Sequence, residues 1–169
     1  TGLSTTESGA ALSAILGRLV EIWPTEVRRI ALVGHSMGGL VIRRACAVTT
    51  DSDWVERVTD VITLGTPHLG SPVERSIARG LRVAERVPEL APYRRIFSKR
   101  SAGVLELSEG ITDLPPVPHI NYRLVAASLS RSSHHPVSLA IGDLLVQPRS
   151  ALGIPRHGSP LFPGASTVH

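Results

Sequence analysis

The sequence has few of the residues that characterise disulfide-bonded, metal-binding and nucleic-acid-binding proteins. Cys46 is the only cysteine among 169 residues, which excludes an intramolecular disulfide and any metal site built from several cysteines. Because Cys46 lies in an apolar stretch of helical character, we expect it to be a small core residue. Aromatic residues make up only 4% of the chain, so the core must consist mainly of Leu, Val, Ile and Ala.

Long apolar runs and basic tracts are absent as well. No run of 18 or more apolar residues occurs, so we expect no membrane-spanning helix in this sequence. The first ten residues lack the basic start and apolar centre of a signal peptide, which favours a cytoplasmic location. Lys99 is the only lysine, and the arginines behind the net charge of +4 are scattered singly or in pairs. No nucleic-acid partner is therefore expected.

What remains is the composition of one folded domain. Hydrophobic residues make up 42% of the chain and charged residues 19%, as in globular proteins. The hydrophobic patterns predict, in chain order, a helix over 10–23, a strand around 30–33, a helix over 37–48, strands over 58–65 and 120–128, and the start of a fourth strand at 166–168. This alternation predicts an α/β fold, with a mostly parallel sheet and helices on both faces. The continuous apolar run at 30–33 predicts a strand that is covered on both faces.

The most informative stretch is Gly-His-Ser-Met-Gly-Gly at 34–39, between a predicted strand and a predicted helix. A serine held on a sharp strand-to-helix turn needs small residues two positions away on either side, because the backbone folds back there, and Gly34 and Gly38 meet this need. Ser36 would project at the carboxyl end of the sheet, where the Met37 amide can donate to an oxyanion. The alternative, a phosphate-binding turn, uses glycine spacings that are not found here.

Two motifs resemble those of a known family. GHSMGGLVIRRA at 34–45 resembles the nucleophile turn of α/β-hydrolase serine esterases and lipases, and LGTPHLGSP at 64–72 is similar to a segment of the lipase-like group that includes GPI-inositol deacylases. The Trp-Pro pair at 23–24 and GDLLVQPRSALG at 142–153 match the same group in the same order. The resemblance implies an α/β-hydrolase that cleaves small-molecule carboxylic esters or lipids through an acyl-enzyme on Ser36. It implies no metal or organic cofactor.

The resemblance also implies a catalytic triad in the chain order Ser, acid, His. Among five aspartates, Asp143 is favoured because it follows the third predicted strand and coincides with the aspartate of the GDLLV match, whereas Asp113 precedes that strand. Only His157 and His169 follow Asp143, and His157 has the setting of a surface residue. The base is therefore His169 or a histidine beyond the last residue. His68 is expected to brace its loop.

The order of the motifs predicts a partial domain. The nucleophile stands at residue 36, where a full hydrolase sheet would already have several strands, and the second oxyanion donor would come from a loop further upstream. We expect 1–169 to form one α/β-hydrolase domain that lacks early strands and a final helix and has an exposed sheet edge. Residues 70–109 fall where such hydrolases insert a cap or lid, although packing helices fit equally. Acyl transfer and a non-catalytic binding domain are the alternative functions.

Overall fold

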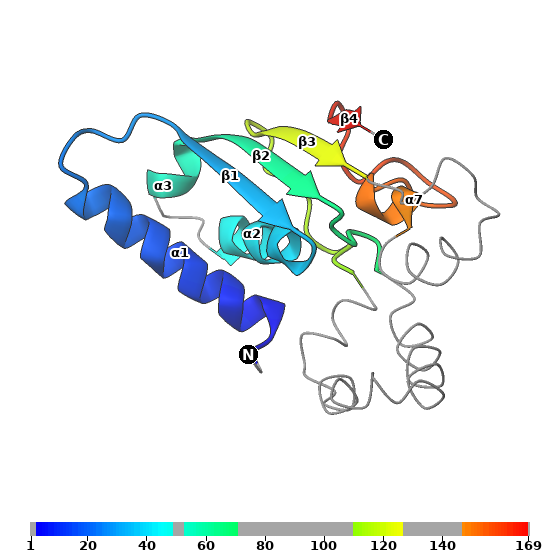
Figure 1. Cartoon of the computed structure of the whole chain (residues 1–169), viewed down its shortest axis with the longest axis horizontal. Helices are drawn as coiled ribbons and strands as arrows, with labels where there is room; N and C mark the ends of the chain where they lie inside the picture. Colours follow the sequence, from blue (N-terminus) through cyan, green and yellow to red (C-terminus); the bar gives the residue numbers. More distant parts are fainter. Residues whose placement is uncertain (1–2, 49–52, 71–109, 127–146, 169) are drawn as a thin grey trace, which may run out of the picture.

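The described residues form a sheet of four parallel strands, which lie side by side in the order in which they occur in the chain (Figure 1). The computed structural model of the chain describes residues 3–48, 53–70, 110–126 and 147–168. Its strands are β1 (Ile30–His35), β2 (Val58–Leu64), β3 (Asn121–Val125) and β4 (Ser166–Val168). The predicted α/β class is confirmed, and 166–168 is indeed a strand.

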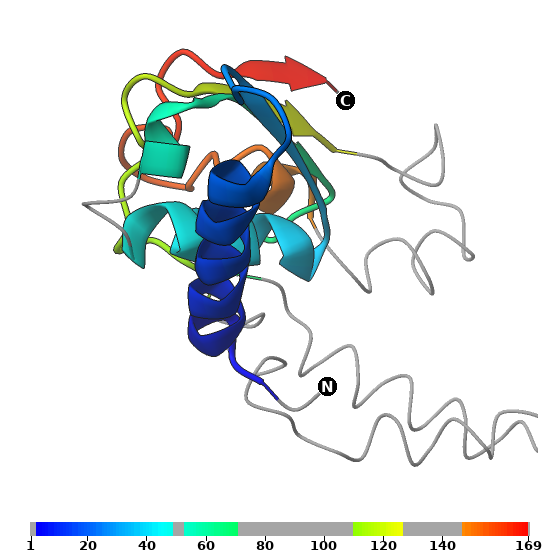
Figure 2. The ribbon, with the colours of Figure 1, turned by 90° about the vertical axis from the view of Figure 1, so that its left-hand side faces the viewer.

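The helices of the described residues are α1 (Thr5–Ile22), α2 (Met37–Val48), α3 (Asp53–Glu56) and α7 (Pro148–Ala151). Figure 2 shows α1 and α2 packed together on one side of the sheet. The first helix begins five residues earlier than predicted because Ser4 caps it. The Ser4 hydroxyl accepts from the Glu7 amide at 3.1 Å, and the Glu7 carboxylate accepts from the Ser4 amide at 2.8 Å.

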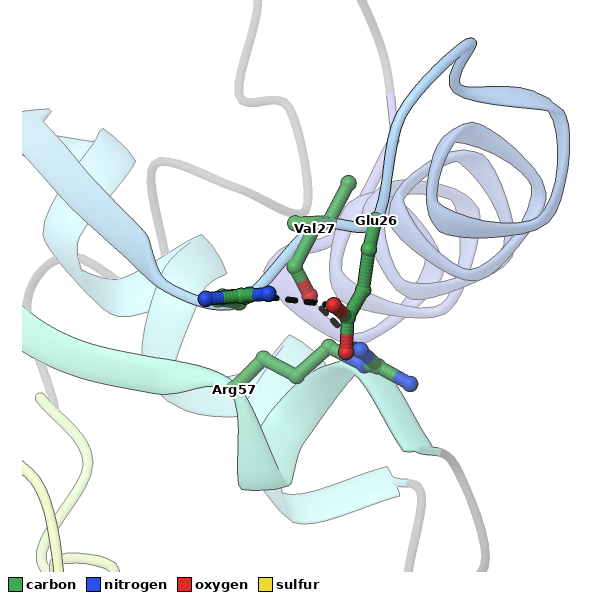
Figure 3. Close-up of polar contacts among 4 residues, drawn as sticks. Glu26, Val27 and Arg57 are labelled. Atoms are coloured by element: carbon green, nitrogen blue, oxygen red, sulfur yellow. Dashed lines mark hydrogen bonds and ion pairs between the residues drawn. The ribbon is translucent and has the colours of Figure 1, made fainter.

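Hydrogen bonds of Arg57 join the amino ends of the first two strands (Figure 3). Arg57, directly before β2, donates from Nη1 to the carbonyl oxygen of Val27 at 2.6 Å. The Arg57 carbonyl in turn accepts from the amide of Ile30, the first residue of β1, at 2.7 Å. The two contacts join the amino ends of β1 and β2. The register shifts between Ile30 and Ala31, and from there His35 and Leu64 lie opposite each other at the carboxyl ends. In this register the end of β2 lies beside Ser36, the residue that follows β1.

The core lies between the sheet and the helices and is mainly aliphatic, as the composition predicts. Trp54 is its largest fully buried side chain, and its indole nitrogen is 3.3 Å from the Ser13 hydroxyl oxygen. Cys46 is buried in the same cluster, and burial raises the pKa of its thiol to about 11. A thiol that holds its proton this firmly is a poor nucleophile. The expectation that Cys46 is a core residue is confirmed.

The other side of β1 departs from the expectation of a strand covered on both faces. Its residues are alternately exposed and partly buried up to Gly34, and the Val33 side chain is 63% exposed. The described helices α1 and α2 cover only the opposite face (Figure 2). Within the described part of the chain, β1 also pairs with β2 alone and forms the edge of the sheet. An uncovered face and a free edge are features expected of a partial domain.

A buried polar and aromatic cluster joins four segments of the fold. The Phe162 ring, before β4, has its centroid 4.7 Å from that of His68 and 4.9 Å from that of Tyr122, and the Arg43 guanidinium lies 5.1 Å from its centroid. His68 is 0% exposed, and its Nε2 is 3.1 Å from the Thr63 hydroxyl. Burial first, and the nearby Arg43 charge second, lower the pKa of His68 to about 3. His68 is therefore neutral in the folded protein at physiological pH.

The neutral imidazole makes the stability of the fold depend on pH. Because an unfolded histidine binds a proton near pH 6.5 and folded His68 does so only near pH 3, the stabilisation is complete above about pH 6.5 and is lost as the pH falls toward 3. We expect His68 to lower the free energy of unfolding by about 2 kcal/mol between about pH 7 and about pH 5. Urea unfolding of the wild type and His68→Asn at both pH values measures this difference.

Ser159→Ala, at an exposed residue that is not titratable, provides the control and should keep the pH dependence of the wild type. An equal pH dependence in the wild type and His68→Asn would contradict the assignment.

Candidate active site

Ser36 occupies a one-residue turn between a strand and a helix. The chain turns sharply between β1 and α2 (Figure 1), and since β1 ends at His35 and α2 begins at Met37, Ser36 is the one residue between them. The φ angle of Ser36 is +52°, and it is the only positive φ of a non-glycine residue in the part of the chain that the structure describes. A serine in this region is strained and keeps the conformation only where its surroundings impose it.

Neighbouring backbone imposes the turn. The Ser36 amide donates to the carbonyl oxygen of Leu64 at the end of β2 at 2.9 Å, and the Ser36 carbonyl accepts from the Gly39 amide at 3.2 Å. A Cβ added to Gly34 would lie 2.6 Å from the Gly39 nitrogen and 2.8 Å from the carbonyl carbon of Gly38, which is closer than Cβ atoms come to other atoms. Only glycine fits at position 34, as the sequence predicts.

The steric reason given for the second glycine does not hold. A Cβ at Gly38 would meet no atom within 4 Å, so its side of the turn is open. The close approach belongs to Gly39, where a Cβ would collide with the Thr66 side chain and lie 2.7 Å from its Cγ2. The prediction failed because sequence spacing cannot show which of two adjacent glycines faces the loop after β2.

The amide of Met37 is available beside Ser36. Met37 is the first residue of the twelve-residue helix α2, and amides in the first turn of a helix have no acceptor within the helix. The helix dipole adds a partial positive charge at this end. An anion that forms on a group bound at Ser36 would therefore meet a hydrogen-bond donor here.

The turn at 65–70 lies next to Ser36, because the Leu64 carbonyl that precedes it is bonded to the Ser36 amide. Its Thr66 side chain is fully buried against Gly39, and its His68 faces Thr63 inside the fold. His68 thus has the arrangement expected of a bracing residue. Thr66 Oγ1 and His68 Nδ1 are buried, and neither has a hydrogen-bond partner among the described residues.

The acid and base predicted from the sequence are not among the residues that the structure describes. Asp143 and His169 are outside the described residues. Of the alternatives, Asp113 is exposed and lies 3.7 Å from Arg44, and His157 is exposed in the loop before β4. In residues 3–48, 53–70, 110–126 and 147–168, no hydrogen bond joins an imidazole to a carboxylate or to Ser36.

Metal-ligand clusters and membrane-spanning helices are both absent from the described residues. These residues contain no group of three or more His, Cys, Asp or Glu side chains that could hold a metal ion. None of the described helices is long and apolar enough to cross a membrane.

The fold resembles that of a lipase of known structure. The mature lipase BlEst2 of Bacillus licheniformis superimposes with a TM-score of 0.62 at 21% sequence identity. The match covers 98% of this chain but only 65% of the lipase, so the chain spans less than two thirds of that protein. The similarity shows the lipase-like α/β-hydrolase fold and confirms the predicted fold class.

A family model agrees with this fold. The model described as "PGAP1-like alpha/beta domain" matches residues 10–132, which include β1, β2, β3 and the Ser36 turn. No curated protein matches the sequence. Since the matched residues are well over half of the chain, this protein belongs to the PGAP1-like α/β domain family of lipase-like α/β-hydrolases.

Proposed function

We propose that this chain carries the nucleophile of a serine hydrolase that cleaves carboxylic esters through an acyl-enzyme on Ser36. The observation that carries the proposal is the positive φ of Ser36 on the turn between β1 and α2. Such strain in a non-glycine residue is found mainly where function requires it. The lipase-like fold supports the same class of reaction, because it is a fold in which ester hydrolysis occurs.

In the proposed mechanism the Ser36 oxygen attacks the ester carbonyl carbon while a histidine takes the hydroxyl proton. The Met37 amide donates to the oxyanion of the tetrahedral intermediate. The intermediate collapses to the acyl-enzyme, and the protonated histidine gives its proton to the departing alcohol. Water then attacks the acyl group in the same way and releases the acid and Ser36. Asp143 is proposed to orient the histidine, and His169 or a later histidine to act as the base.

We propose lipid-like or other acyl esters as substrates, since the similar Bacillus protein is named a lipase. We also propose that 1–169 is a single domain in which residues 70–109 are an insertion between β2 and β3. The contact between Gly70 and Gly110 supports this organisation, because a Cβ at Gly110 would collide with the Gly70 nitrogen. The chain thus leaves the sheet and returns to it at one point.

A non-catalytic binding domain is the second candidate function. It is favoured by one observation: within the described residues no imidazole is bonded to Ser36 or to a carboxylate. Reactivity of the serine separates the two candidates, because a binding domain needs no activated hydroxyl.

Replacement of Ser36 should abolish covalent labelling. A fluorophosphonate probe should modify Ser36 in the natural protein that contains these residues, and Ser36→Ala should reduce labelling to background. Hydrolysis of a short acyl ester should fall by about 10⁴-fold or more, because the nucleophile is lost. Mass spectrometry of the labelled peptide and initial rates measure the two effects.

Ser159→Ala, at an exposed serine in the loop before β4, is the control and should label like the wild type. Equal labelling of the wild type and Ser36→Ala would refute the proposal, and an unreactive wild type would favour the binding domain.

The two glycines that flank the serine should differ sharply when changed to alanine. Gly34→Ala places a Cβ against the backbone of Gly38 and Gly39, and we expect the free energy of unfolding to fall by about 2 kcal/mol or more. Gly38→Ala meets open space in a helix, so its stability should be unchanged or rise by up to about 1 kcal/mol. Urea denaturation of both variants tests this, and equal destabilisation would mean that the described turn is wrong.

A further inference from the structure

The turn at 65–70, which follows the Leu64 carbonyl bonded to Ser36, contacts residues 110–111. Gly110, with a φ of +73°, lies so close to residues 68–70 that an added Cβ would be 2.6 Å from the Leu69 carbonyl carbon and 2.7 Å from the His68 carbonyl oxygen. The next amide, that of Ile111, donates to the same His68 oxygen at 3.0 Å. The position of the turn at 65–70 is therefore tied to the position of residues 110–111.

Arg43, a buried arginine on α2, forms hydrogen bonds with the segment that follows Gly110. The Arg43 Nη1 donates to the carbonyl oxygen of Ile111 at 2.7 Å, and its Nη2 donates to that of Leu114 at 2.6 Å. Arg43 is only 5% exposed, and its guanidinium also lies over the Phe162 ring. The planar fork of an arginine can reach two carbonyl oxygens at once, which a lysine ammonium cannot do in the same geometry.

Burial of this cation without a bonded carboxylate is costly. Burial lowers the pKa of Arg43 to about 10, so the side chain still carries its charge at neutral pH. In the described structure its partners are two carbonyl oxygens and an aromatic ring, while the nearby Asp113 lies beside Arg44 instead. An apolar side chain would avoid the cost of desolvation but could not hold the two carbonyls. The geometry therefore indicates that fixing these carbonyls is the role of Arg43.

Contacts of α2 and of the turn at 65–70 connect residues 110–114 to the turn at Ser36. Helix α2 starts next to Ser36 and contacts the turn at 65–70 at Gly39, while seven residues after Ser36 it holds Ile111, which is bonded to His68. From the other side, the Ser150 hydroxyl of α7 accepts from the Leu69 amide at 3.1 Å and donates to the Gly70 carbonyl at 2.6 Å. The turn beside Ser36 is thus fixed from two helices.

We propose that Arg43 is a positioning residue for the reaction at Ser36, an inference that rests on the proposed function. Through Ile111 it fixes the turn at 65–70, which directly follows the Leu64 carbonyl that accepts from the Ser36 amide. Arg43 itself touches neither the substrate nor the reacting atoms. Its loss lets the turn shift, and small displacements of the groups around a reacting centre lower the rate strongly.

Arg43→Lys tests the proposal, because it keeps the charge and removes the fork. We expect the rate constant for fluorophosphonate labelling of Ser36 to fall on the order of tenfold, measured well below the melting temperature where every molecule is folded. A purely structural role would lower the melting temperature and leave this rate constant unchanged. Amide hydrogen exchange of Ile111 should become faster in the same variant, since its partner segment is released.

Arg44→Lys is the matched control, because Arg44 is the next residue of the helix and lies beside an exposed aspartate. It should label at the wild-type rate. If Arg43→Lys does not fold, Ser150→Ala releases the same turn from α7 and should slow labelling in the same way. A wild-type rate in the folded variant, or an equal loss in Arg44→Lys, overturns the positioning role. A wild type that is not labelled overturns the proposed function and this inference with it.

Discussion

The left-handed backbone at Ser36 is the constraint on which the rest of the described structure depends. It is held by the hydrogen bond from the Ser36 amide to the Leu64 carbonyl, and that bond requires β1 and β2 to be in one register. At the far end of the strands Arg57 joins the same two segments, ahead of the register shift between Ile30 and Ala31. The pairing of β1 with β2 and the left-handed serine that follows β1 thus depend on each other.

Buried polar side chains also fix the positions of loops. His68, Arg43 and Ser150 lie under the loops at the carboxyl end of the sheet and bond mainly to backbone atoms or to a threonine hydroxyl. Loops have no regular hydrogen-bond partners of their own, so buried side chains that supply such partners give them a defined position. Burying these polar groups is unfavourable in free energy, but their hydrogen bonds keep irregular segments in place near Ser36.

Much of the fold could be predicted from the sequence because it depends on local patterns. The apolar runs that became β1 and β2 and the glycine-serine motif at 34–39 each specify their structure within a few residues. The early start of α1 could also have been found, since Ser4 and Glu7 form a capping box that is visible in the sequence.

The remaining features depend on contacts between residues that are far apart in the chain. Arg43 bonds to residues 68 and 71 positions away, and Ser150 bonds to residues about 80 positions away, so no local pattern indicates either role. The same holds for Gly39, whose importance comes from Thr66. The exposure of Val33 depends on what covers a sheet face, which a strand's own residues do not determine. Asp143 and His169 stay predictions.

Among the described residues, β1 has an uncovered face and a free edge, which has a consequence for work with this chain in isolation. An edge strand with unpaired amides and carbonyls is a template for another strand, and Val33 adds an apolar surface beside it. Two molecules that meet along β1 can satisfy those groups in each other. Strand addition can begin at an edge of the kind that the described residues leave at β1, and a charged residue or a proline on β1 is the change that would oppose it.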